Sequence, residues 1–244
     1  MYTPWVTIDR FITLFKSNRQ PRLAVLIDPD KYNPELVKLC HKSSVACILL
    51  GGSRLEKGNI HATALSIKKL TNKPLILFPG DENQLTRAAD GALLPLLLSG
   101  RNPDYLGGKQ VLMAPTLKQL KLEPTPIGYL LVNGGTASTT QKVTGTQPLD
   151  PTNSQWIVDT ALACQYMGCK AVYLEAGSGA AHTVHASIIR KVKRVLDVPL
   201  IAGGGVDSAK KAAALIKAGA DMVVVGNALE KDVTLLASLT PLFK

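Results

Sequence analysis

Short apolar runs alternate with longer segments of helical periodicity along most of the chain. The clearest example is residues 199–230, with the sequence PLIAGGGVDSAKKAAALIKAGADMVVVGNALE. Two apolar strands, Leu200–Ala202 and Met222–Val225, flank a helix that Asp207 or Ser208 can cap. Neither strand alternates apolar with polar residues, which is typical of parallel strands covered on both faces. The segment therefore predicts a strand, a helix, a second strand and the start of another helix.

The same alternation recurs from the first third of the chain onwards. Strands are expected at residues 23–27, 46–50, 75–78, 92–98, 127–132, 171–174, 200–202 and 222–225. Helices are expected at residues 5–16, 34–44, 60–70, 102–110, 154–167 and 208–218. Eight strands with interleaved helices predict a closed, TIM-like (βα)8 barrel with an N-terminal helix packed on it. A doubly wound open sheet remains the alternative, because periodicity does not show closure.

Three segments depart from this alternation. Residues 81–90 are short for a full crossover helix, which predicts an irregular, shortened third helical segment. Such a segment either opens an apolar groove in the helical layer or is a trimmed loop. Residues 111–114 are ambiguous, after a helix that Gly107 and Gly108 interrupt. The polar, Thr-rich residues 137–154 are expected to form a long, mobile loop.

Length and composition favour one folded domain spanning residues 1–244. The chain has 244 residues, 46% hydrophobic and 19% charged, which suits a single barrel and argues against disorder. Its apolar runs are too short to cross a bilayer, and its first twenty residues lack the pattern of a signal peptide. We expect a cytoplasmic protein.

The net charge limits the classes of partner that we expect, and the spacing of the cysteines bears on their redox state. The net charge of +10 favours phosphorylated substrates, nucleic acid or an anionic membrane surface. The basic cluster at residues 190–194 has no interleaved aromatic residues, so we expect no nucleic-acid partner, while peripheral membrane contact stays open. The cysteines form no CxxC pair and are expected to be buried, reduced thiols: Cys40, Cys47, Cys164 and Cys169.

Glycines follow the last two predicted strands and predict a phosphate site. Gly203, Gly204 and Gly205 remove side chains where backbone N–H groups can face an anion, and Gly226 with Asn227 repeats this one strand later. Two neighbouring helix N-termini would then converge on one phosphate, at the usual place in (βα)8 barrels. The alternative is that the glycines only make tight turns.

Two carboxylates stand at the ends of other strands. Asp28 follows the first strand and, with Ser53 after the second, offers hard oxygen ligands for Mg²⁺. Glu175 follows the sixth strand and can act as a general base on a hydroxyl. Each of the three also has a plain alternative as a helix or turn cap. His182 and His185 are expected to cap or line the next helix rather than to bind a metal.

Seven segments together resemble the geranylgeranylglyceryl phosphate synthase family, which includes the bacterial heptaprenylglyceryl phosphate synthases. They are LAVLIDPDK (23–31), ILLGGS (48–53), LFPG (77–80), YLLVNGGTAS (129–138), YLEAGSGA (173–180), AGGGV (202–206) and VVGNALE (224–230). YLEAGSG is the most specific of them, whereas AGGGV recurs in many phosphate-binding barrels. The resemblance covers nearly the whole chain, in order.

The resemblance implies a Mg²⁺-dependent prenyltransferase. It would join a polyprenyl diphosphate, geranylgeranyl diphosphate foremost, to the C3 hydroxyl of sn-glycerol 1-phosphate and release diphosphate. Asp28 and Ser53 match the metal positions, and Tyr173 and Glu175 match the catalytic ones. The glycerol-phosphate positions are matched by Tyr173, Leu174, Glu175, Ala176, Gly177, Ser178, Gly179, Gly203, Gly204, Gly205, Gly226 and Asn227.

The resemblance also bears on the prenyl groove and on assembly. In this family an irregular, strand-like segment beside the groove replaces the third helix, which agrees with residues 81–90. The apolar run 92–98 is a candidate groove wall, with ordinary barrel core as the alternative. Leu26 stands where some members carry a lysine, so a phosphate contact from that position is not expected here. Because the family includes dimers and hexamers, we expect a homo-oligomer.

Two other functions would use the same phosphate site at Gly203–Gly205 and Gly226, which we call the phosphate cup. A sugar-phosphate isomerase or a related barrel enzyme is one, but isomerases of phosphoribosyl compounds need an acid where Asn133 stands. An aldolase-type enzyme needs an inward lysine in a strand, and the strands offer none. A non-catalytic phosphate-binding or membrane-surface scaffold is the other rival, and it would need neither Asp28 nor Glu175.

Overall fold

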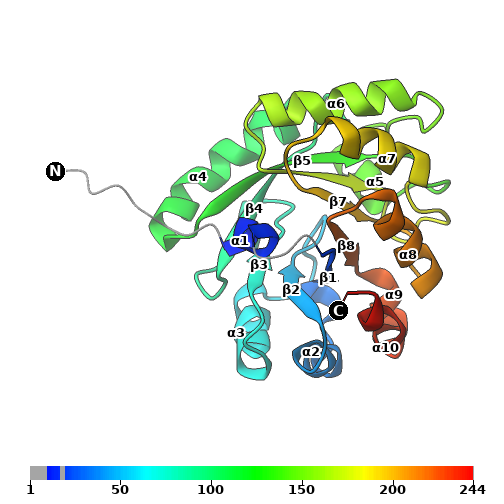
Figure 1. The fold of residues 1–244 in the computed structure, drawn as a ribbon. Helices are drawn as coiled ribbons and strands as arrows, with labels where there is room; N and C mark the ends of the chain where they lie inside the picture. Colours follow the sequence, from blue (N-terminus) through cyan, green and yellow to red (C-terminus); the bar gives the residue numbers. More distant parts are fainter. Residues whose placement is uncertain (1–9, 17–19, 244) are drawn as a thin grey trace.

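The strands close into a single parallel barrel. The computed structural model describes residues 10–16 and 20–243. Its eight strands pair in sequence order, and the first pairs with the last, as Figure 1 shows. They are β1 (Arg22–Ile27), β2 (Val45–Leu50), β3 (Leu75–Leu77), β4 (Gly91–Leu96), β5 (Pro124–Leu131), β6 (Ala171–Glu175), β7 (Leu200–Gly203) and β8 (Met222–Val225). The (βα)8 prediction is confirmed, and the open sheet is excluded.

Helices cover the outside of this barrel. They are α1 (Arg10–Lys16), α2 (Pro34–His41), α3 (Ile60–Leu70), α4 (Lys109–Leu120), α5 (Thr139–Thr144), α6 (Ser154–Tyr166), α7 (Ala186–Val195), α8 (Ala209–Ala218), α9 (Asn227–Lys231) and α10 (Leu235–Leu239). Side-chain caps explain where several of them begin, because each satisfies a free N–H group of the first turn. The capping residues are Asn33, Asn59, Ser138, Asn153, His185 and Ser208.

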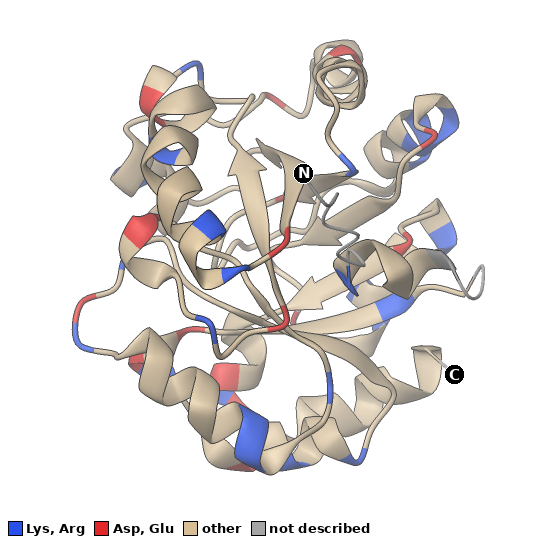
Figure 2. Cartoon of the chain, turned by 90° about the vertical axis from the view of Figure 1, so that its left-hand side faces the viewer, with Lys and Arg blue, Asp and Glu red and all other residues tan. Residues whose placement is uncertain are grey.

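The core has two layers, divided by the alternation of side chains along each strand. One layer fills the barrel and includes Leu49, Ile76 and Ile201. The other lies between strands and helices and includes Leu50 and Leu174. Figure 2 shows the charged residues mainly on helices and loops, with few along the strands. Apolar strand faces on both sides explain why the strands lack polar alternation.

Helix α1 closes the barrel at the end where the strands begin. Phe11 is 1% exposed and belongs to the inner layer. Its ring meets that of Phe15 edge to face, with the ring centroids 5.5 Å apart. Arg22 opens β1, and its Nε donates a hydrogen bond to the Leu14 carbonyl oxygen. The expected helix at residues 5–16 is confirmed from residue 10 onwards, while residues 5–9 lie outside the described part.

The segment between β3 and β4 contains only one turn of 3-10 helix, Glu82–Gln84. Gln84 is fully buried, and its amide accepts from the Gly52 N–H at 2.9 Å and donates to the Gly52 carbonyl at 2.8 Å. The expected irregular third segment is confirmed, and Gln84 fastens it to the loop after β2.

The prediction of a mobile loop at residues 137–154 is wrong. The segment contains α5, and Val132 forms a parallel bridge with Leu149. The Thr144 hydroxyl donates to the Thr140 carbonyl oxygen at 2.7 Å and also contacts the Thr146 hydroxyl. Three of the threonines that suggested a solvated loop, Thr140, Thr144 and Thr146, are buried and hydrogen-bonded within the segment, which composition alone does not reveal.

The prediction of a broken helix near residue 107 is also wrong. Asp104–Gly108 form a π-helical turn that continues directly into α4, so residues 111–114 are helical. The Tyr105 carbonyl oxygen accepts from the Leu97 N–H at 3.1 Å, which ties this turn to the end of β4. Glycine is compatible with helical backbone, and the tertiary contact compensates its low propensity.

The remaining fold predictions concern cysteines and membrane spans. All four cysteines are free thiols and buried, as expected. Among residues 10–16 and 20–243, no helix is both long enough and apolar enough to cross a bilayer.

Replacing Phe11 tests the role of α1. We expect Phe11→Ala to lower the free energy of unfolding by about 3 kcal/mol, because it empties a closed, apolar site. Urea unfolding followed by circular dichroism measures this, with the milder Phe11→Leu as the matched control. An unchanged urea midpoint in Phe11→Ala would show that α1 does not stabilise the barrel.

Candidate active site

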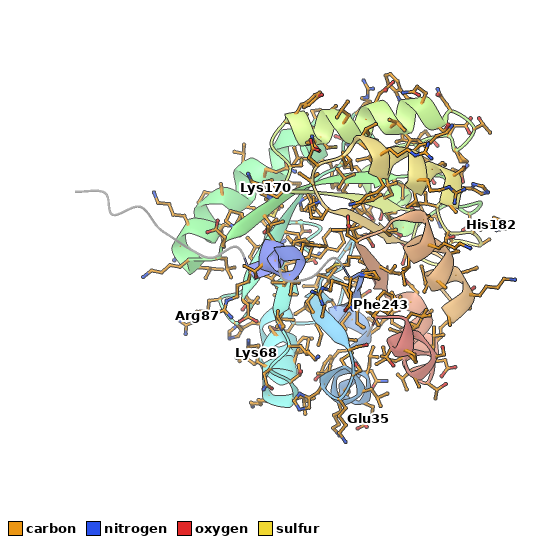
Figure 3. All side chains as sticks on the ribbon, viewed as in Figure 1. Glu35, Lys68, Arg87, Lys170, His182 and Phe243 are labelled. Carbon is orange, nitrogen blue, oxygen red and sulfur yellow. The ribbon has the colours of Figure 1, made fainter. Side chains whose placement is uncertain are left out.

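The carboxyl ends of the strands surround a cavity of about 510 Å³. Loops after β1, β2, β3, β6, β7 and β8 line it, and so do residues of α4 and α5. This is the end of a (βα)8 barrel at which ligands bind. Figure 3 draws the described side chains as sticks on the ribbon.

Three aromatic rings form the floor of the cavity. Phe78, Tyr129 and Tyr173 contact one another with ring centroids 5.3–5.7 Å apart. Tyr129 and Tyr173 are register partners on β5 and β6, so parallel pairing puts both side chains at one level. Burial raises the pKa of both phenols well above the usual value, and the Glu175 charge adds to this. Both hydroxyls therefore stay protonated and can donate hydrogen bonds.

Glu175 is the last residue of β6 and points into the barrel beside Tyr173. It is 7% exposed, and this burial raises the pKa of its carboxyl group. Hydrogen bonds from the Tyr173 hydroxyl and from the Gly177 N–H, at 2.9 Å, partly offset the rise. A buried carboxylate with a raised pKa is a stronger base than an exposed one. Glu175 is thus suited to take a proton from a bound hydroxyl.

The glycines after β7 make room for this pair. A Cβ atom added at Gly203 would lie 2.2 Å from the Tyr173 hydroxyl, and one at Gly204 would lie 2.4 Å from a Glu175 carboxylate oxygen. Gly204 also has a φ of +79°, which favours glycine. These positions therefore accept no side chain, whether or not an anion binds there.

The structure brings most of the predicted site residues to the cavity. Those that line it are Asp28, Ser53, Tyr173, Glu175, Ser178, Gly179, Gly204, Gly205, Gly226 and Asn227. Leu174 and Ala176 do not, because their side chains point into the outer core layer. Gly177 and Gly203 act through Glu175 and Tyr173 instead. The role of Leu174 and Ala176 at the substrate site stays a prediction.

The phosphate cup differs in one respect from the expected pair of helix N-termini. Helix α8 begins only at Ala209, capped by Ser208, four residues after Gly205. The cup is therefore a glycine turn before α8 together with the start of α9 at Asn227. The Ser178 hydroxyl donates to the Asn227 side chain, which joins the loops after β6 and β8. Backbone N–H groups in such a concave turn suit an anion.

The opposite side of the cavity carries Asp28 and Ser53. One Asp28 oxygen accepts from the Asp30 N–H at 2.9 Å, so Asp28 also caps the turn that follows, as its alternative role predicts. The Ser53 hydroxyl lies 3.2 Å from that of Thr140, which also bonds the Tyr129 hydroxyl. These are hard oxygen donors at a cavity wall.

This donor set fits Mg²⁺ bound jointly with a substrate. In the described part of the chain, no three His, Cys, Asp or Glu side chains cluster closely enough to hold a metal alone. Mg²⁺ commonly takes one or two protein oxygens and fills its shell with water and phosphate oxygens. The donors Asp28 and Ser53 match that mode. His185 instead caps α7, accepting from the Ser187 N–H, as expected.

A second arm of the cavity is apolar. Pro95 and Leu97, at the end of β4, line the cavity together with Met113 of α4 and Val143 of α5. Of the run 92–98 these two residues therefore reach the cavity, and their role as a wall for a prenyl chain stays a prediction. Leu26 also lines the cavity, so no lysine reaches it from this position.

Comparisons with known proteins decide the family. A model of the PcrB family matches residues 16–239 of the 244. The chain belongs to the PcrB family. It is similar to geranylgeranylglyceryl phosphate synthase of Zunongwangia profunda, with 43% identity over 228 residues, 91% of this chain and 96% of that protein. The synthase of Pyrococcus horikoshii is 42% identical over 212 residues, which cover 85% and 83% of the two chains.

A solved structure extends the likeness of this PcrB-family chain to three dimensions. The (S)-3-O-geranylgeranylglyceryl phosphate synthase of Thermoplasma acidophilum, solved with its substrate sn-glycerol-1-phosphate, superposes with a TM-score of 0.88. The identity is 31%, and the match covers 95% of each chain. The resemblance drawn from seven sequence segments is confirmed.

Other site residues of this PcrB-family protein were not found from its sequence. Tyr129 was missed, although its position one strand before Tyr173, in a matching apolar strand, is a usable signal. Lys31 and Glu230 were missed as well, and they form an ion pair at 3.1 Å across the cavity rim. Residues 199 positions apart give no local signal for such a contact.

The buried carboxyl of Glu175 predicts a pH dependence of stability. Its pKa is raised in the folded state, so the folded protein binds this proton more tightly than the unfolded chain does. Stability from this group is therefore present below the unfolded pKa and is lost as pH rises through the folded pKa.

Glu175→Gln keeps the acceptor for the Gly177 N–H but never ionises. Above the folded-state pKa of Glu175, we expect this variant to have a higher Tm than the unmodified protein. Thermal unfolding between about pH 4 and pH 8 measures the difference. Equal Tm values across the range would show that ionised Glu175 is not under strain from burial.

Proposed function

We propose that this protein transfers a polyprenyl group, geranylgeranyl foremost, from its diphosphate to the C3 hydroxyl of sn-glycerol 1-phosphate. The observation that carries the proposal is the position of Glu175. This buried base lies between a glycine cup suited to a phosphate and an oxygen-lined wall suited to a metal-bound diphosphate. An apolar groove opens from the same cavity.

The acceptor would bind at the glycine cup. Gly204, Gly205 and Asn227 surround the place for its phosphate, which leaves its glycerol end towards Glu175. The substrate bound to the Thermoplasma acidophilum synthase supports this choice of acceptor. Binding the phosphate at one rim orients the hydroxyl for attack. Such orientation lowers the activation free energy of a two-substrate reaction substantially.

The donor would lie on the other side. Its hydrocarbon chain suits the arm lined by Pro95, Leu97, Met113 and Val143, because burying apolar surface favours binding. Its diphosphate would then lie towards Asp28 and Ser53. Arg54 also lines this part of the cavity and offers a cation to the diphosphate.

Asp28 and Ser53 are the residues that would hold Mg²⁺. When bound, the ion supplies positive charge that stabilises the departing diphosphate. Lys31 lies close by, with its Nζ 3.7 Å from Asp28 and 3.1 Å from Glu230, so these two carboxylates offset its charge.

Glu175 would accept the proton of the attacking C3 hydroxyl. As the C3 oxygen forms its bond to the first carbon of the prenyl group, the bond from that carbon to the diphosphate oxygen breaks. The hydroxyl proton passes to the Glu175 carboxylate, and diphosphate leaves with the bonding electrons. The Tyr173 hydroxyl, hydrogen-bonded to Glu175, keeps the carboxylate in place.

The rival isomerase has less support. Asn133 stands where a phosphoribosyl isomerase needs an acid, and its side chain accepts from the Gly135 N–H at 2.9 Å to build a turn. The family match and the apolar groove both favour prenyl transfer over isomerisation.

Assembly and location remain predictions. Self-association as a homo-oligomer agrees with the family and with apolar side chains exposed on α4 and α6, such as Val111, Leu112 and Trp156. Peripheral membrane contact and a cytoplasmic location rest on charge and composition.

Removing the metal or its carboxylate tests the mechanism. We expect Mg²⁺-dependent transfer of radiolabelled sn-glycerol 1-phosphate into an organic-extractable product, across prenyl diphosphates of increasing length. Asp28→Asn or EDTA should lower the rate by roughly 100-fold or more, because the leaving charge loses its counterion. Asp159→Asn, an exposed change on α6, is the control. Full activity in EDTA would contradict the metal role, and no product with any donor would contradict the function.

Replacing Arg54 tests the position of the diphosphate. We expect Arg54→Ala to raise KM for the prenyl diphosphate roughly tenfold while leaving KM for sn-glycerol 1-phosphate unchanged. Arg87→Ala removes an exposed arginine that does not line the cavity and serves as the control. Figure 3 shows Arg87 on the side of the molecule opposite His182. Equal KM values for Arg54→Ala and the unmodified protein would place the diphosphate elsewhere.

A further inference from the structure

A lysine on α8 donates a hydrogen bond to the glycine turn after β7 without lining the cavity. The Lys211 Nζ donates to the carbonyl oxygens of Gly205, at 3.1 Å, and Ala181, at 3.2 Å. It also forms an ion pair with Asp207 at 2.8 Å. Lys211 therefore joins the loop after β6 to the turn after β7, the two loops that flank Glu175.

These contacts fix the direction of the neighbouring peptide groups. In a trans peptide the C=O and the following N–H point in opposite directions. The Ala181 peptide follows this rule, because its carbonyl oxygen meets Lys211 while the His182 N–H donates to the Gly134 carbonyl oxygen at 3.1 Å. By the same geometry, the Val206 N–H points away from Lys211, and Val206 lines the cavity while Lys211 does not.

Lys211 also changes the charge at the cup. Asp207 lines the cavity, where its carboxylate would repel a phosphate. The hydrogen bond from Lys211 is the main cause that lowers the pKa of Asp207, and the Lys211 Nζ, 2.8 Å away, offsets the charge of this carboxylate. The turn thus presents N–H groups without an uncompensated negative charge.

We propose that Lys211 is a positioning residue of the phosphate site, which aims the Val206 N–H at the substrate phosphate and neutralises Asp207. The proposal rests on the proposed function, since it takes sn-glycerol 1-phosphate as the ligand of the cup. Lys211 does not itself line the cavity. Its effect on binding therefore passes through the turn and through Asp207.

Calorimetric titration of the full chain with sn-glycerol 1-phosphate tests the proposal. We expect Lys211→Met to raise Kd roughly tenfold, the usual loss for a charge-assisted contact, with KM for the prenyl diphosphate unchanged. Lys211→Arg should restore most of the affinity. Adding Asp207→Asn to Lys211→Met should recover part of it, because the exposed negative charge is removed.

Lys193→Met is the matched control. Lys193 pairs with Asp221 at 2.6 Å at the opposite end of the barrel, so its loss should change stability and leave Kd unchanged. An unchanged Kd in Lys211→Met would overturn the proposal, and so would a parallel loss of affinity for both substrates. Failure of the unmodified protein to bind sn-glycerol 1-phosphate would instead overturn the proposed function.

Discussion

The site depends on the pairing of β1 with β8, which closes the barrel. Arg22 to Val25 align with Met222 to Val225, and this register brings the loop after the first strand against the loop after the last. The Lys31 to Glu230 ion pair forms across that seam. In an open sheet these loops would lie at opposite edges, and Asp28 and the start of α9 would not line one cavity.

Within the closed barrel, Glu175 and the phosphate cup are held in place by different interactions. Glu175 ends a strand, so its position is fixed by the sheet, and burial raises its pKa. The phosphate cup lies in loops, which hydrogen bonds from Ser178 and Lys211 fasten to one another. The groove depends on α4, α5 and the end of β4, where the chain departs most from a regular barrel. The strands thus fix Glu175, while the apolar lining of the cavity comes from the less regular segments.

Periodicity was sufficient to predict the order of strands and helices, because most strands are apolar and several helices have side-chain caps, but the closure of the sheet became visible only in the structure. Glycines and carboxylates at strand ends were sufficient to locate Asp28, Glu175 and the cup, because parallel strands place their carboxyl ends together. Threonines that satisfy one another in α5 look polar in sequence and were therefore misassigned to a loop. Long-range partners such as Lys31 and Glu230, and the support from Lys211, depend on tertiary geometry that no local pattern records.

The contact between Gly203 and Tyr173 has a consequence for sequence variation. A side chain at position 203 would occupy the space of the Tyr173 hydroxyl, so Gly203 cannot be replaced while that tyrosine stays in place. A substitution of Gly203 should therefore be accompanied by one of Tyr173 among related proteins. A relative with a larger residue in place of Gly203 is expected to have lost the tyrosine as well, and with it the hydroxyl that holds the base. The joint presence of both residues is a more discriminating marker of this chemistry than the glycine-rich turn by itself.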